Sequence, residues 1–205
     1  MTFSSANVVG TLPENVVLET GPGGNDLFVA KKQVADATYK VSGDTGFSGK
    51  TLTKSEVNVE TKKGETTTVS VNSTFKQTNI QNEGKGSLQV NVVGSTFKKG
   101  KVTGGKQSDN VSFDGNSSVL KATVNLGKGN DTITFSKGSQ VKGRNFVNLG
   151  KGGKDSVVIE DLNNIKGTLI IRKFGKKDTV TVNGKVYSYS DRKALNNLDG
   201  IKIKG

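Results

Sequence analysis

Short stretches in which apolar and polar residues alternate recur along most of the chain. In residues 131–135, Ile133 and Phe135 alternate with Thr132 and Thr134. Because successive side chains of a β-strand point to opposite faces, this stretch predicts a strand that buries Ile133 and Phe135. Turn residues separate the stretches, and the chain holds 27 glycines. The pattern therefore predicts an all-β protein built from short strands.

A repeat of 22–24 residues organises these stretches. Residues 73–76, with the sequence Ser-Thr-Phe-Lys, recur at residues 95–98. The same spacing continues in an apolar column of Phe75, Phe97, Val119, Val141 and Ile165. It also appears in an acidic column of Asp109, Asp131, Asp155 and Asp178, each followed at two and four positions by an apolar residue. Independent columns that share one period indicate a solenoid.

The repeat predicts a single-stranded parallel β-helix, in which every coil contains several short strands and stacks on the coil before it. One coil cannot cover its own apolar residues, and the next coil does so while pairing its strands. Residues 51–189 have room for about six such coils at the usual strand spacing. Residues 1–50 do not share the repeat clearly, and we expect them to form an N-terminal cap or anchoring arm. Residues 190–205 are expected to cap the other end, since open ends expose strand edges.

The earlier coils fit the repeat less well than the later ones. Leu88, Val90 and Val92 alternate one residue out of phase with the acidic column's apolar followers. An extra residue inserted in one strand shifts the alternation in this way. We therefore expect a β-bulge at this point of the solenoid.

The C-terminal segment carries turn and helix signals. The pair Asn183-Gly184 lies between two alternating stretches, which predicts a hairpin with a type I′ turn. A short helix over residues 192–198 is expected to begin at Ser190 or Asp191 and to end before Gly200. The apolar residues after it predict a last strand.

The charge is distributed unevenly along the chain. The formal net charge is +12, but residues 1–60 sum to −2 and residues 61–205 to +14. Most of the basic residues are lysines that lie singly or in pairs in the expected turns, and arginine, whose planar fork suits phosphate, is scarce. This dispersal is typical of a solubilising surface and does not point to nucleic acid as a partner. No uninterrupted apolar stretch approaches the length of a membrane span.

The composition excludes several kinds of catalytic site. Cysteine and histidine are absent, which removes thiol chemistry, the usual zinc ligands and Ser-His-Asp triads. A pair of carboxylates for glycoside cleavage would have to come from Glu160, Asp161, Asp114 or Asp109. No acidic pair recurs at the same place on neighbouring coils, so we expect the protein not to be an enzyme and assign no catalytic residues.

A glycine-rich segment at residues 43–51 invites comparison with a phosphate-binding loop. It has five residues between Gly43 and Gly49 where that motif needs four, and the residues after Lys50 alternate like a strand. A phosphate-binding loop opens a helix, whose dipole holds the anion. We therefore predict an ordinary glycine turn.

Residues 126–135, with the sequence Leu-Gly-Lys-Gly-Asn-Asp-Thr-Ile-Thr-Phe, resemble the glycine-rich nonapeptide of the RTX, or haemolysin-type calcium-binding, family. Residues 150–157 and 175–182 are similar but poorer copies. In that family the glycine turn and its aspartate bind calcium in a β-roll, so the resemblance implies a calcium role for Asp131 and Asp155. Otherwise no cofactor is expected.

Two departures from the family pattern count against calcium. A β-roll closes a turn with two nine-residue units, whereas this chain repeats every 22–24 residues. Each candidate turn also carries lysines, whose ammonium groups oppose a cation that needs six to eight oxygen ligands. The alternative is that the aspartates accept hydrogen bonds from turn amides and pair with these lysines.

Three functions are compatible with this pattern. The first is a non-enzymatic structural β-solenoid on the surface of a large assembly, with a phage virion as the favoured assembly and capsid decoration or an appendage as the role. It predicts a multi-copy protein with protein partners, such as a capsid shell, and fits the absence of a secretory signal. The second is a secreted RTX-like calcium-binding module or adhesin, placed outside the cell or on its surface. The third is a carbohydrate-active β-helix enzyme.

Overall fold

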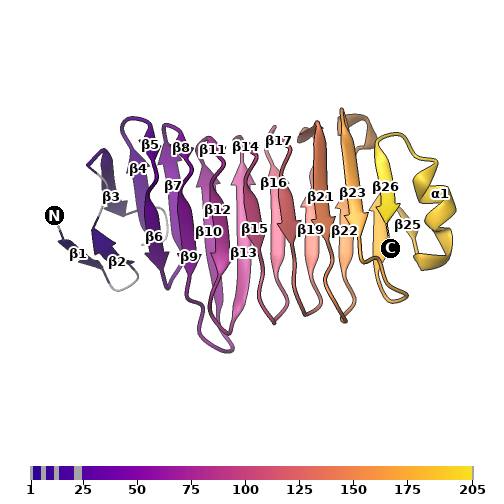
Figure 1. Cartoon of the computed structure of the whole chain (residues 1–205), viewed down its shortest axis with the longest axis horizontal. Helices are drawn as coiled ribbons and strands as arrows, with labels where there is room; N and C mark the ends of the chain where they lie inside the picture. Colours follow the sequence, from indigo (N-terminus) through magenta and orange to yellow (C-terminus); the bar gives the residue numbers. More distant parts are fainter. Residues whose placement is uncertain (1, 6–7, 12–13, 21–24, 205) are drawn as a thin grey trace.

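The alternating stretches fold as predicted: in the computed structural model the chain winds into a parallel β-solenoid of about seven coils (Figure 1). Each coil contributes a strand to two long sheets, and all but the last also to a shorter third sheet. The structure describes residues 2–5, 8–11, 14–20 and 25–204, and the side chains from residue 14 onward. The predicted all-β parallel β-helix is thereby confirmed.

We name the three sheets A, B and C. Sheet A consists, in spatial order, of β1 (Thr2–Ser5), β2 (Val8–Thr11), β6 (Thr38–Val41), β9 (Glu56–Val59), β12 (Asn79–Asn82), β15 (Lys101–Thr103), β18 (Thr123–Asn125), β21 (Arg144–Asn148), β23 (Thr168–Arg172) and β26 (Ile201–Lys204). Sheet B consists of β3 (Val16–Thr20), β4 (Asp26–Ala30), β7 (Thr45–Gly49), β10 (Thr66–Asn72), β13 (Ser87–Val93), β16 (Asn110–Asp114), β19 (Thr132–Phe135), β22 (Ser156–Ile159), β24 (Thr179–Val182) and β25 (Lys185–Tyr187). Sheet C consists of β5 (Val34–Ala35), β8 (Leu52–Thr53), β11 (Phe75–Lys76), β14 (Thr96–Lys98), β17 (Ser118–Leu120) and β20 (Gln140–Lys142).

The predicted apolar column is a ladder of paired residues in sheet C. Phe75 pairs with Phe97, Phe97 with Val119, and Val119 with Val141. A single parallel bridge joins Val141 to Ile165, where the 3-10 helix η2 (Leu162–Asn164) replaces a strand. All five side chains are buried. The inward columns are therefore the core of the solenoid, and each coil covers the apolar residues of the next.

The bulge that we predicted at Leu88, Val90 and Val92 is not present. Strand β13 pairs residue for residue with both neighbours, so that Val90 lies opposite Val69 on one side and Val111 on the other. The three apolar side chains are buried in phase with the later coils. The step from Val90 to Val111 is 21 residues, one fewer than the step from Val111 to Ile133, because the turn between β13 and β14 is one residue shorter than the turn between β16 and β17. The predicted bulge was wrong because a shorter turn shifts the alternation in the sequence in the same way as an extra strand residue.

The parallel coils include residues that the sequence analysis assigned to the N-terminal cap or arm. Strands β4, β5 and β6 pair in parallel with β7, β8 and β9, and so form a complete coil. Before them the pairing is antiparallel: β3 pairs with β4, β2 with β6, and β1 with β2. Sheets A and B thus end at this side in β1 and β3.

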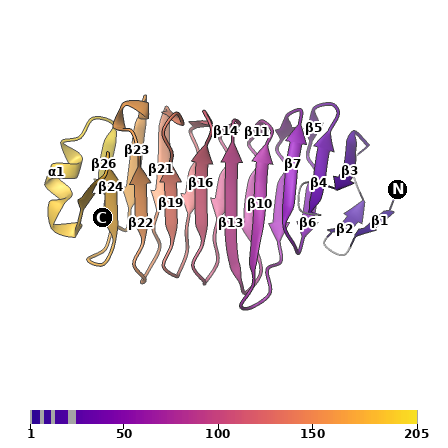
Figure 2. The same ribbon diagram turned by 180° about the vertical axis from the view of Figure 1, so that it is seen from behind.

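A hairpin, a short helix and a last strand close the other end (Figure 2). Strands β24 and β25 pair antiparallel across Asn183 and Gly184, which both have positive φ, as the predicted type I′ turn requires. After η3 (Tyr189–Asp191), helix α1 covers Arg192–Asn196 and buries Leu195. The carboxylate of Asp191 bonds the N–H and hydroxyl groups of Ser188 instead of capping α1.

Strand β26 follows the helix and pairs in parallel with β23, which confirms the predicted final strand. The helices of the described residues are all too short to cross a membrane.

Candidate functional sites

The predicted acidic column is a hydrogen-bonded ladder between coils. One carboxylate oxygen of each aspartate accepts the backbone N–H of the aspartate one coil earlier, at 2.8 Å from Asp109 to Asp131 and at 3.0 Å in the next two steps, Asp131 to Asp155 and Asp155 to Asp178. Asp109 itself accepts the N–H of Leu88 at 2.6 Å. All four side chains are buried beside the start of a strand of sheet B. We call this set the aspartate ladder.

Burial dominates the electrostatics of the aspartate ladder. Removal from water raises the pKa of Asp131 to about 7 and that of Asp155 to about 6, and it also raises the pKa of Asp109. The hydrogen bonds from the neighbouring amides act in the opposite direction, and the charges of adjacent ladder carboxylates add to the increase for Asp131 and Asp155. The second oxygen of Asp131 is buried without a hydrogen-bond partner. The ladder therefore favours a protonated Asp131 near neutral pH.

The aspartate ladder does not fit the calcium cage that the RTX resemblance implies for Asp131 and Asp155. Each carboxylate already accepts an amide hydrogen bond, and calcium needs six to eight oxygen ligands around one point. Among the described residues no group of three or more acidic side chains is placed to hold a metal ion. The expected hydrogen bonds to amides are present. The expected ion pairs with lysines are not, because within the described residues the one ion pair joins Lys31 to Glu19.

The carboxylates considered for glycoside cleavage all have structural partners. Asp109 belongs to the aspartate ladder, and Asp161 accepts the N–H of Asn163 at the start of η2. Glu160 accepts the N–H of Lys137 at 2.8 Å, and Asp114 accepts the hydroxyl of Ser136. These contacts join successive coils or cap a turn, so each of these acidic residues has a structural role that explains its presence.

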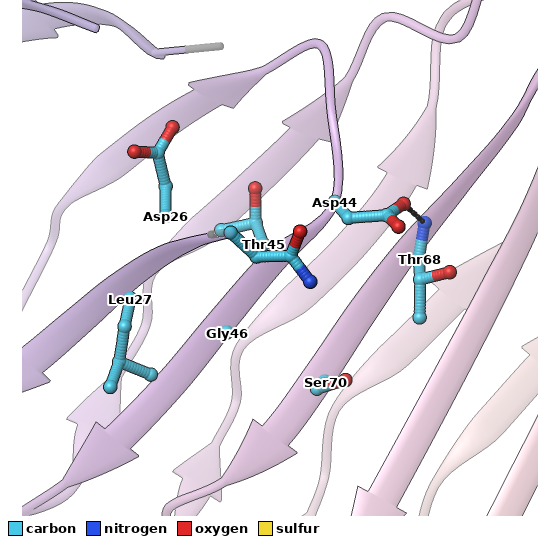
Figure 3. Close-up of a pocket in the computed structure, with 8 residues that line it drawn as sticks. Asp26, Leu27, Asp44, Thr45, Gly46, Thr68 and Ser70 are labelled. Atoms are coloured by element: carbon cyan, nitrogen blue, oxygen red, sulfur yellow. Dashed lines mark hydrogen bonds between the residues drawn. The ribbon is translucent and has the colours of Figure 1, made fainter. Parts of the chain in front are cut away.

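A hollow of about 280 Å³ lies on the outer face of sheet B, near the N-terminal end (Figure 3). Gly46 lies between Leu27 on β4 and Ser70 on β10, and the side chain that it lacks leaves the hollow open. Asp44 is held at the rim, where its carboxylate accepts the N–H of Thr68 at 2.7 Å. The segment at residues 43–51, predicted to be a glycine turn, is mostly strand β7, and the chain bends only before the strand and at its end, where Gly49 has positive φ.

A second hollow, of about 330 Å³, lies at the corner between sheets A and B. It is lined by a column of glycines, a column of lysines and two asparagines, namely Gly105, Gly127, Gly150, Lys106, Lys128, Lys151, Lys173, Asn125 and Asn148. We call it the lysine groove. The amide of Asn148 donates a hydrogen bond to the side-chain oxygen of Asn125, so these two side chains form one wall across two coils.

Two glycines of the lysine groove, Gly127 and Gly150, leave no room for a larger residue. A Cβ atom on Gly127 would lie 2.3 Å from the carbonyl oxygen of Gly105, and one on Gly150 would lie 1.7 Å from that of Gly127. The corner is therefore a narrow floor of backbone with lysines beside it. Sequence analysis treated these lysines as dispersed. The signal that it missed is the Gly-Lys pair that recurs at 105–106, 127–128 and 150–151.

Comparison with protein-family models, with curated protein sequences and with solved structures finds no match to this chain.

Proposed function

We propose that the protein is a non-enzymatic structural component of a large assembly, a rigid β-rod displayed on its surface. A phage virion is the assembly that we favour, with the rod as a capsid decoration or appendage present in many copies. The choice of a virion rests on analogy of architecture, because a rod of stacked coils suits display and attachment. The observation that carries the proposal is the difference between the two ends of the solenoid.

At the C-terminal end, sheets A and B finish in β26 and β25. Helix α1 packs against β26 and buries Leu195 fully, while Val186 of β25 is 62% exposed. At the N-terminal end, sheets A and B finish in the edge strands β1 and β3. The unpaired side of an edge strand can extend a sheet into another chain. Val17 of β3 is 43% exposed, which adds an apolar contact at this end. Both ends thus hold edge strands and an exposed valine, and the helix that packs against β26 is the difference between them. Because that helix blocks part of the C-terminal end, we assign attachment to the N-terminal end and display to the C-terminal end.

The hydrogen bonds that the carboxylates considered for glycoside cleavage already accept within the fold support a non-enzymatic role. Glycoside hydrolysis needs two carboxylates that face one bond from opposite sides. Here the acidic side chains considered for that role accept hydrogen bonds from the backbone or from a serine of the fold. Both hollows lie on the outside of the solenoid.

The proposal is tested with two fusions to the native host's copy of the protein. A bulky fluorescent domain is joined to the N-terminus in one and to the C-terminus in the other, and particles are isolated by density gradient. The C-terminal fusion should appear in particles at the same copy number as the untagged chain, and the N-terminal fusion should be excluded. Absence of the untagged chain from every particle fraction would contradict the structural role, whereas equal incorporation of both fusions would contradict only the assigned end.

A further inference from the structure

We propose that the lysine groove is a binding site for an acidic polysaccharide, with one negatively charged sugar unit held per coil. This inference is independent of how the rod is attached, because the groove lies at a corner of the solenoid wall and not at its N-terminal end.

The first support is a row of uncompensated charges. Lys106, Lys128, Lys151 and Lys173 come from four successive coils, and all four are exposed. None of them forms an ion pair with another residue that the structure describes; the one ion pair among those residues joins Lys31 to Glu19. The nearby aspartate ladder does not neutralise them, because its carboxylates are buried and bonded to amides.

The second support is the spacing of the row. The N–H of Lys128 bonds the carbonyl of Gly105, and the N–H of Lys151 bonds that of Gly127, at 3.1 and 3.2 Å. These bonds keep the turns of Lys106, Lys128 and Lys151 in step, so these three lysines repeat at the strand spacing of about 4.8 Å. That repeat is close to the length of one sugar unit in an extended polysaccharide. The three lysines then span about 10 Å along the rod, and Lys173 of the next coil lines the same groove out of this register. This length suits an oligosaccharide of about three charged units.

The third support is the chemistry of the wall. The side chains of Asn125 and Asn148 offer donors and acceptors at the level of the groove, and sugar hydroxyl groups need both. The glycine floor lets a flat ring approach the backbone closely, and its turn amides are already bonded between coils. Recognition is left to the lysine and asparagine side chains.

These features favour a polysaccharide over a nucleic acid. Proteins that bind single strands stack bases on aromatic rings, and no aromatic residue lines the groove. The aromatic ring of Phe146, on the outer face of β21, has the guanidinium groups of Arg144 and Arg172 at 5.3 and 4.3 Å from its centroid. Both of these contacts already use the face of the ring. The charges in the groove are also lysine ammonium groups rather than the forked guanidinium groups that read phosphate bidentately.

The test compares one groove variant with one matched control in the full chain. The groove variant is K128Q/K151Q. The control K76Q/K142Q removes the same charge from exposed positions on β11 and β20 of sheet C, away from the corner between sheets A and B. The labelled probes are a sulfated heparin oligosaccharide, a carboxylated oligogalacturonate, oligothymidylate of equal charge and a neutral dextran oligomer. Binding is followed by fluorescence anisotropy at several salt concentrations, and circular dichroism checks that both variants keep the wild-type fold and Tm.

We expect one or both acidic oligosaccharides to bind saturably and dextran not to bind. Loss of two direct charge contacts should weaken acidic oligosaccharide binding in K128Q/K151Q by about tenfold or more, and the salt dependence should become shallower. The control should stay within about twofold of the wild type. The proposal is overturned if both variants lose affinity equally, if no acidic oligosaccharide binds, or if oligothymidylate binds as tightly and depends on the same two lysines.

Discussion

Replacement of Asp131 by asparagine should make the solenoid more resistant to alkaline pH. The carboxylate is fully buried, one oxygen accepts the N–H of Asp109, and the other has no partner. Its pKa is raised from the usual 3.8 to about 7, chiefly because burial disfavours the ionised form. The side-chain amide of the D131N variant would keep an acceptor for the N–H of Asp109 and could not ionise.

The sign and size of the effect follow from proton linkage. Between the unfolded and folded pKa of Asp131 the folded state holds a proton that the unfolded state has lost, so stability falls as pH rises. From pH 5 to the folded pKa of about 7 there are two pH units, each worth about 1.4 kcal/mol. The free energy of unfolding of D131N, relative to the wild type, should therefore increase by about 3 kcal/mol between pH 5 and pH 8. For a chain of this size that difference corresponds to roughly 6–12 °C in Tm.

Urea denaturation of both proteins at pH 5, 6, 7 and 8, followed by circular dichroism, measures this difference. The comparison across pH cancels the constant cost of the buried amide group, about 1–3 kcal/mol if its N–H groups stay unpaired. D191N is the flat control, because the bonds to Ser188 lower the pKa of the exposed Asp191, so its difference from the wild type should not change between pH 5 and pH 8. Its stabilising effect is present above the unfolded pKa and is lost as pH falls. A D131N difference that stays constant within about 0.5 kcal/mol from pH 5 to pH 8 would refute the account of the aspartate ladder.

Three other perturbations test the packing and the calcium question. F97A removes a fully buried ring between Phe75 and Phe113 and should lower the free energy of unfolding by about 3–5 kcal/mol, whereas V93A, at a side chain 46% exposed, should change it by less than about 0.5 kcal/mol in the same urea titration. G150A should prevent folding or lower Tm far more than G152A in thermal scans. A Cβ on Gly150 would lie 1.7 Å from a carbonyl oxygen, whereas a Cβ on Gly152, which also has positive φ, meets nothing within 4 Å. Similar Tm values for the two variants would show that the corner can relax. Addition of millimolar calcium should leave Tm unchanged within about 1 °C. If calcium did bind, a concentration of about 100 times its Kd would stabilise the folded state by about 2.7 kcal/mol and raise Tm visibly. A rise of several degrees that a chelator reverses would therefore restore the calcium role of Asp131 and Asp155.

The sequence was informative wherever one type of residue recurs at one place on every coil. The column from Phe75 to Ile165 and the aspartate ladder were both predicted, because a side chain stacked on its own kind leaves a period that can be counted. The type I′ turn at Asn183-Gly184 was also predicted, because few residue pairs tolerate positive φ twice in succession.

The sequence was less informative where the coils differ in length or composition. The ladder position of the coil before Asp109 is occupied by Leu88, and Thr67 lies opposite Leu88 in the coil before that, so the acidic signal stops at Asp109. The coil of β4, β5 and β6 was not predicted either, because it too differs in length or composition from the later coils. The lysine groove could not be foreseen as a site, because the corner geometry that gathers lysines from four coils depends on close backbone contacts between glycines.

In the proposed function, a rigid rod stands on a larger particle by its N-terminal strands. Cross-linking mass spectrometry of intact particles measures this most directly, because lysines lie near both ends of the solenoid, among them Lys31 and Lys32 beside β4 and Lys193 and Lys202 in the C-terminal cap. The account predicts cross-links from Lys31 or Lys32 to another protein of the particle and none from Lys193 or Lys202. Cross-links to the particle that come from the C-terminal cap alone would contradict it.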